Sequence, residues 1–143
     1  MESPVSADTP TPAEFNPADY RILVVDDDLD MLSLIQVTLG HDGYRVEVAE
    51  RGGEGLARLE SEPFDLVIVD TYMPDMLGIE LLRRVRAEAR WAGLRVIVFG
   101  AGRADHQRAL DAGADGWIDN PTSHAHLEAA VRRALLGERT QPG

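Results

Sequence analysis

Three aspartates in this chain stand where their carboxylates could do chemistry together. Asp26 and Asp27 directly follow the apolar run at residues 22–25, and Asp70 ends a second apolar run at residues 66–69. Short apolar runs bounded by polar residues are typical of strands buried on both faces of a parallel sheet. If the two strands are neighbours, their carboxyl ends meet at one rim of the sheet, where open α/β sheets bind ligands. The sequence therefore predicts an acidic pocket at that rim.

Carboxylates crowded into one pocket repel each other, and a divalent cation relieves that repulsion. Mg²⁺ prefers oxygen ligands, keeps several waters and takes only one or two carboxylates directly. One carboxylate would then be free to attack phosphorus, since an aspartyl phosphate is a known covalent intermediate. The alternative is that these acids simply end strands and cap helices, as Asp28 could do for the first helix. That alternative leaves unexplained why adjacent acids follow one buried strand while a third ends another.

The residues after the third aspartate extend the pattern into a motif. From Asp70 to Gly78 the chain reads Asp-Thr-Tyr-Met-Pro-Asp-Met-Leu-Gly. Together with the acidic pair and the rhythm of strands and helices, this stretch resembles the receiver domain of two-component response regulators. The resemblance runs from about residue 21 to residue 136. Pro74 and Gly78 fit a rigid loop that leads into the third helix.

The resemblance implies a role for each residue of the pocket. Asp70 would be the phosphoacceptor, Asp27 would bind Mg²⁺ directly, and Asp26 would act mostly through water. The backbone carbonyl of Tyr72 would complete the metal ligands. Mg²⁺ is therefore the expected cofactor.

Two positions depart from the family pattern. Gly100 stands where the family has Thr or Ser, and Asn120, before Pro121, stands where it has Lys. The family's hydroxyl bonds the phosphoryl group and its Lys pairs with it, whereas Gly100 has no side chain and Asn120 carries no charge. Backbone N–H groups of the Gly100-Ala101-Gly102 loop are still expected to reach the phosphoryl oxygens. This is an atypical receiver, and Gly100→Thr with Asn120→Lys is expected to strengthen its response.

Trp117 falls where the family places an aromatic side chain that swings with the activation state. Because no hydroxyl at position 100 pulls toward the phosphoryl group, the side chain is either core filler or partner-facing surface. The histidines show no metal-ligand spacing and are expected on the surface; they are His41, His106, His124 and His126.

The rest of the chain predicts the elements that hold the pocket. Strand and helix patterns alternate five times, which predicts parallel strands joined by crossover helices. The fold class is α/β, a doubly wound five-stranded parallel sheet of flavodoxin-like architecture. The expected strands are 21–25, 44–49, 65–69, 94–99 and 116–118. The expected helices are 28–39, 53–59, 78–90, 104–112 and 123–136.

The expected domain organisation is a single receiver domain with two tails. Residues 1–19 are rich in Pro and acidic residues and are expected to be disordered, because they carry little apolar surface to bury. The receiver domain would span residues 20–137, and residues 138–143 would form a C-terminal tail.

Composition excludes several classes of function. The formal net charge is −11, from 14 Lys and Arg against 25 Asp and Glu, which disfavours direct binding to nucleic acid. The chain has no cysteine, so disulfides and thiolate metal sites are excluded, and a cytoplasmic location fits. No apolar run reaches the 18 residues of a membrane span.

The interpretation that follows is signal reception rather than enzymatic turnover. A histidine kinase or phosphotransfer protein would donate a phosphoryl group to Asp70 with Mg²⁺. The domain would then act on a downstream protein target through protein contacts, and a homodimer is left open.

Three alternatives come from other classes. A phosphorylation-independent pseudo-receiver, serving as an interaction module, is favoured by Gly100 and Asn120 but opposed by the intact acidic triad. An aspartate-nucleophile phosphatase would need a second acid where Tyr72 stands. An FMN-binding flavodoxin would place the phosphate against residues 26–28, three aspartates that would repel it.

Overall fold

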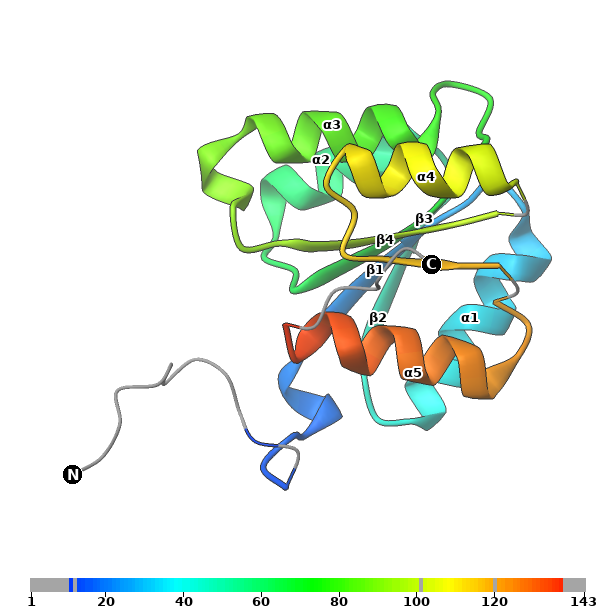
Figure 1. Ribbon diagram of the computed structural model, residues 1–143. Helices are drawn as coiled ribbons and strands as arrows, with labels where there is room; N and C mark the ends of the chain where they lie inside the picture. The colour runs from blue at the N-terminus through cyan, green and yellow to red at the C-terminus, as the bar shows by residue number, and fades with distance from the viewer. Residues whose placement is uncertain (1–10, 12, 101, 120, 138–143) are drawn as a thin grey trace.

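The computed structural model describes residues 11, 13–100, 102–119 and 121–137. Five parallel strands form one sheet in the order β2-β1-β3-β4-β5, with helices on both faces (Figure 1). The strands are β1 (Arg21–Val25), β2 (Arg45–Ala49), β3 (Leu66–Asp70), β4 (Arg95–Phe99) and β5 (Gly116–Ile118). The helices are α1 (Leu29–His41), α2 (Gly52–Ser61), α3 (Gly78–Ala87), α4 (Arg103–Asp111) and α5 (His124–Leu135), with short 3-10 helices η1 (Pro17–Asp19) and η2 (Ala89–Trp91).

Alternate residues of each central strand face two separate layers of the core. In β1, Ile22 and Val24 pack with the apolar residues of α1 and α5, whereas Leu23 and Val25 pack with those of α2, α3 and α4. Figure 1 shows these two helix layers on opposite faces of the sheet. All four side chains are fully buried. The predicted doubly wound parallel sheet is confirmed.

The third helix ends earlier than its apolar pattern predicts. α3 stops at Ala87, because Glu88 adopts an extended conformation and the chain then forms η2. Trp91 packs against the core on the α3 side of the sheet, and the Arg90 guanidinium lies 4.3 Å from the centre of its ring. The helix therefore ends before Glu88, which is neither Gly nor Pro, and Trp91 packs on the core just after this point.

Part of the segment predicted to be disordered is instead packed on the domain. Phe15 stacks on Tyr20 with 5.2 Å between ring centres and meets the edge of Tyr44 at 6.3 Å. The Arg132 guanidinium of α5 lies 4.6 Å from the centre of the Phe15 ring. One aromatic side chain therefore anchors residues 13–19, while residues 1–10 and 12 lie outside the described part.

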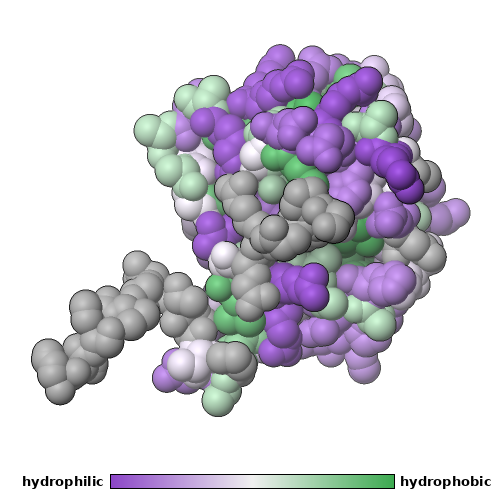
Figure 2. All heavy atoms as spheres, in the orientation of Figure 1, coloured by the Kyte–Doolittle hydropathy of each residue, from purple (hydrophilic) through white to green (hydrophobic). Residues whose placement is uncertain are grey.

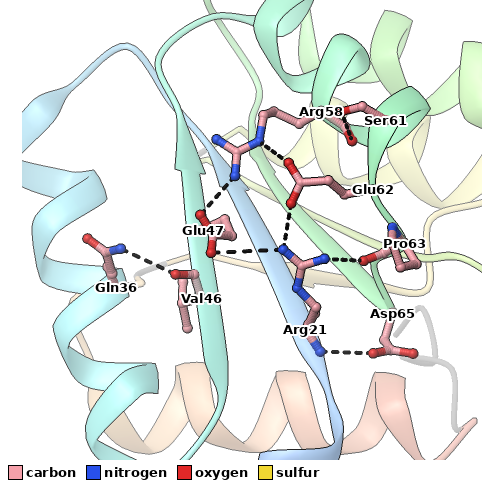
Figure 3. Close-up of polar contacts among 9 residues, drawn as sticks. All are labelled: Arg21, Gln36, Val46, Glu47, Arg58, Ser61, Glu62, Pro63 and Asp65. Carbon is pink, nitrogen blue, oxygen red and sulfur yellow. Dashed lines mark hydrogen bonds and ion pairs between the residues drawn. The ribbon is translucent and has the colours of Figure 1, made fainter.

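An ion-pair network joins β1, β2 and α2 near the amino end of β1 (Figure 3). Arg21 contacts Glu62 at 2.6 Å and Glu47 at 3.9 Å. Arg58 contacts the same two carboxylates, Glu47 at 2.8 Å and Glu62 at 3.0 Å. Partly exposed pairs of this kind contribute about 0–1 kcal/mol each. The network fastens the otherwise exposed edge strand β2 to its neighbours.

The face of the molecule over α3, α4 and α5 is mostly hydrophilic (Figure 2). Among the described residues, no helix is long and apolar enough to cross a membrane.

Candidate functional site

The three predicted aspartates meet at the carboxyl ends of two adjacent strands. β1 pairs with β3 in parallel, with Val25 opposite Val69, so both strands end at the same rim. Carboxylate oxygens of Asp26, Asp27 and Asp70 all lie within 4.8 Å of one another. Asp26 is buried, Asp70 is half-buried and Asp27 is exposed. This arrangement can hold a metal ion.

Burial and mutual repulsion raise the pKa values of two acids in this pocket. Burial, with smaller contributions from Asp70 and Asp27, raises the pKa of Asp26 to about 7. Burial also raises the pKa of Asp70, and the neighbouring Asp27 adds to the shift. The carboxylate oxygens of Asp26 and Asp70 lie within 4.8 Å of one another, so each charge disfavours ionisation of the other group.

A backbone donor orients the Asp26 carboxylate. The N–H of Asp28 donates to it at 3.2 Å. The N–H of Thr71, the residue after Asp70, donates to the Phe99 carbonyl at 3.1 Å. Asp27 is the acid of the three that is most open to solvent.

The loop after β3 folds back tightly onto the strand. The N–H of Gly78 donates to the Thr71 carbonyl at 2.8 Å, and Tyr72 forms an isolated bridge with Leu77. A Cβ at position 78 would collide with the backbone carbonyl of Asp70. Glycine is therefore required where the predicted loop enters α3.

The middle of the same loop is fastened to α2. Arg51, which precedes α2, makes no side-chain cap. Instead, the Asp75 carboxylate accepts from the N–H of Gly52 at 3.0 Å and of Gly53 at 2.8 Å. Pro74, the residue before Asp75, is exposed. Sequence reasoning missed Asp75, because its partners lie on an element far away in the chain.

The space beside Gly100 is occupied by another hydroxyl group. A Cβ at position 100 would lie 2.5 Å from Oγ1 of Thr71 and 3.4 Å from the Trp117 ring. The Thr71 hydroxyl is buried and donates to the Phe99 carbonyl at 2.7 Å. Residues 71 and 100 follow neighbouring strands in register, which is the one sequence signal that could have paired them.

Trp117 is core filler, one of the two roles expected for it. Its side chain is 7% exposed and belongs to the core layer under α2, α3 and α4. His106 of α4 is not a surface histidine as expected, because its ring stacks on Trp117 at 5.1 Å and 7°. Pro121, three residues after the end of β5, is buried. Ala101 and Asn120 lie outside the described residues.

Tyr72 reaches from the acidic rim to a residue that the sequence did not single out. Its hydroxyl donates to Oδ2 of Asp105 on α4 at 2.8 Å. Asp105 is buried, and its other oxygen accepts from Arg108 at 3.0 Å. In the pattern of apolar and polar residues along the helix, Asp105 looks like any exposed polar residue. Nothing in the sequence therefore indicates that it contacts Tyr72.

Comparisons with known proteins agree with this geometry. Residues 22–132 match the family model described as the response regulator receiver domain. The transcriptional regulatory protein KdpE of Mycobacterium tuberculosis is 38% identical over 128 residues, which cover 85% of this chain and 55% of that protein. The response regulator ArlR of Staphylococcus haemolyticus is 34% identical over 122 residues, which cover 85% of this chain and 54% of that protein. The chain thus spans about half the length of these curated relatives.

Solved structures of receiver proteins match the fold over most of the chain. The chemotaxis response regulator CheY4 of Vibrio cholerae superposes with a TM-score of 0.75 at 29% identity, over 80% of this chain and 98% of that one. A CheY-like receiver domain protein of Methanospirillum hungatei gives 0.74 at 36% identity, over 81% of this chain and 93% of that one. The chain therefore belongs to the response regulator receiver domain family.

Proposed function

We propose that this receiver domain accepts a phosphoryl group on Asp70 from a phosphohistidine. The observation that supports the proposal is the meeting of three carboxylates, from two adjacent strands, within 4.8 Å. One of them, Asp70, is the last residue of β3 and is only half-buried. A nucleophile must be both positioned and reachable, and a half-buried carboxylate at the end of a rigid strand suits that role.

In the proposed reaction an oxygen of Asp70 attacks the phosphorus atom. The new oxygen–phosphorus bond forms as the phosphorus–nitrogen bond breaks, and the imidazole of the donor leaves with that electron pair. Asp26, Asp27, Asp70 and the Tyr72 carbonyl would hold Mg²⁺, which supplies positive charge to the phosphoryl oxygens when bound. Because the pKa of Asp26 is raised, Mg²⁺ binding would compete with a proton for this pocket.

The partners are inferred from the same chemistry. The donor would be a histidine kinase or a phosphotransfer protein, and the phosphorylated domain would act on a downstream protein target through contacts. The domain would therefore work as a signalling module rather than as an enzyme with a turned-over substrate. Its relatives named above are themselves a response regulator and a transcriptional regulator.

Intact mass after incubation with acetyl phosphate tests the proposal. We expect the wild-type chain to gain the mass of one phosphoryl group only with Mg²⁺ present, and Asp70→Asn to gain none. Asp111→Asn is the matched control, because it changes an exposed aspartate outside the pocket and should be phosphorylated like the wild type. No gain in the wild-type chain with Mg²⁺ would instead support the phosphorylation-independent interaction module.

A further inference from the structure

One side chain joins the loop beside Asp70 directly to α4. The Tyr72 ring is 61% exposed, so core packing does not hold it. It is held at its tip, where the hydroxyl donates to Asp105 at 2.8 Å. At its other end, its backbone lies in the loop that leaves β3, two residues after Asp70. The same residue therefore joins the loop beside the candidate phosphoacceptor to the helix.

The carboxylate that receives this hydroxyl is buried within the first turn of α4. Asp105 is 8% exposed, and its two oxygens are taken by Tyr72 and by Arg108. Its Oδ2 also lies only 3.0 Å from where a Cβ of Gly102 would be. A buried carboxylate that loses a donor must regain one or move toward water. Loss of the Tyr72 hydroxyl would therefore disturb the start of α4.

The next residue of α4 carries the disturbance to β5. His106 stacks on Trp117, with 5.1 Å between ring centres and 7° between ring planes. Nε2 of His106 is buried and has no hydrogen-bond partner among the described residues, so stacking is its main tie to the core. The indole N–H of Trp117 donates to Asp119 at 2.7 Å. Movement of α4 would change the surroundings of the indole.

We infer that the Tyr72 hydroxyl is the latch through which the chemical state of Asp70 is read by α4 and Trp117. The inference rests on the proposed function. Phosphoryl transfer adds a charged group to Asp70, two residues before Tyr72, whose carbonyl is one of the proposed Mg²⁺ ligands. The Tyr72 backbone then shifts, and its hydroxyl leaves Asp105. A ligand shifts a conformational equilibrium only through interactions that differ between the two states, and this contact is one.

The latch would couple Asp70 to α4 without a side chain at position 100. Gly100 has no side chain to pull toward a phosphoryl group, and the adjacent space is filled by Thr71 and Trp117. Among the described residues, Tyr72 is the one residue of the loop after β3 whose side chain donates a hydrogen bond to α4. This coupling uses residues other than the substituted ones.

Trp117 fluorescence tests the latch in a Trp91→Phe background, where it is the remaining tryptophan. The phosphoryl mimic is beryllofluoride with Mg²⁺, added to saturation for each variant. We expect beryllofluoride to change the Trp117 emission when Tyr72 and Asp105 are both intact. In Tyr72→Phe, the Trp117 emission without beryllofluoride should already resemble that of the Tyr72-containing protein at saturation. Adding beryllofluoride to Tyr72→Phe should then change the emission no further. Tyr44→Phe is the matched control, because its buried hydroxyl has no partner among the described residues.

A second variant shows whether the effect passes through this one hydrogen bond. Asp105→Ala should reproduce the emission of Tyr72→Phe, and the double variant should match either single variant. Amide hydrogen exchange without metal or beryllofluoride should also be faster in α4 for both single variants. Additive effects, or unchanged exchange in α4, would overturn the latch.

The outcomes separate the latch from the proposed function. If the wild-type chain gains phosphoryl mass and Tyr72→Phe keeps the full fluorescence change, the latch alone is wrong. If the wild-type chain gains no phosphoryl mass with Mg²⁺, the proposed function fails and the latch loses its role as a switch.

Discussion

Two small residues determine the shape of the rim beside the acidic pocket. Thr71 places its hydroxyl where a side chain at position 100 would begin, and the Phe99 carbonyl holds that hydroxyl in place. The hydroxyl is satisfied and buried, so it cannot move aside without losing its partner. Glycine at 100 and threonine at 71 are therefore a matched pair. The expectation that Gly100→Thr would simply restore a missing hydroxyl overlooked this neighbour.

Gly100→Ala should destabilise the protein by about 1–3 kcal/mol, the usual range for overpacking a buried contact. The added Cβ would stand 2.5 Å from Oγ1 of Thr71. Urea denaturation of Gly100→Ala, Thr71→Ala and the double variant measures the interaction free energy between positions 71 and 100. The double variant should be more stable than the sum of the single changes predicts. Simple additivity would show that the two positions do not compete for space.

The protonated pocket predicts how the stability of the metal-free protein changes with pH. The pKa of Asp26 is about 7 when folded and 3.8 ordinarily, so between these values the folded state holds a proton that the unfolded state releases. This contribution is fully present below the ordinary value and is lost as the pH rises through 7. The change is on the order of 4 kcal/mol at most.

Urea denaturation in EDTA at several pH values checks this dependence. The difference in unfolding free energy between wild type and Asp26→Asn isolates the contribution from that of other acids. We expect Asp26→Asn to gain stability relative to wild type as the pH rises toward 7. Parallel pH profiles for the two proteins would contradict a buried, protonated carboxyl group at position 26.

At the scale of elements, the strands were predictable because burial on both faces requires consecutive apolar residues. Residues 22–25 and 66–69 show this directly, and the position of Asp26, Asp27 and Asp70 just beyond them predicted the pocket. The end of α3 was not predictable, because Glu88 is neither Gly nor Pro and its extended conformation accompanies the packing of Trp91 on the core.

Contacts between elements were the part that the sequence could not supply. The bond from Tyr72 to Asp105 and the packing of Thr71 against Gly100 depend on distances between strands and helices that no local pattern encodes. The packing of Phe15 on Tyr20 and Tyr44 was missed for another reason. A single aromatic residue does not change the average composition of a segment rich in Pro and acidic residues.

Phe15→Ala should lower the free energy of unfolding by about 1–3 kcal/mol, because it removes a ring that packs on two others and on a guanidinium. Thermal and urea denaturation measure the effect. Val37→Ala is the control, since it shortens an apolar side chain that is 68% exposed and should change stability little. Equal stability of Phe15→Ala and wild type would mean that the segment contributes nothing to the fold.

At the scale of the whole molecule, the charge of −11 includes three carboxylates gathered at one rim. A cation bound there would stabilise the folded state, because the unfolded chain has no such cluster. Mg²⁺ at about 100 times its dissociation constant would add about 2.7 kcal/mol. The midpoint of thermal unfolding should therefore rise with millimolar Mg²⁺.

The rise should vanish in Asp27→Ala and persist in Asp30→Ala, which removes one exposed acid close in sequence but outside the cluster. It should also grow with pH, since the metal displaces the proton held by the pocket. Equal effects of Mg²⁺ on both variants would place the cation elsewhere on the acidic surface.

The loop from Tyr72 to Gly78 is fixed along its backbone, but its tyrosine ring is not fixed by packing. Tyr72 bridges Leu77, Asp75 ties the middle of the loop to α2, and Gly78 ties the far end to Thr71. The tyrosine ring is held at its tip alone, by Asp105. If the latch operates, the side chain at position 72 would set how strongly α4 responds to Asp70. One substitution there would then change the response and leave the acidic pocket as it is.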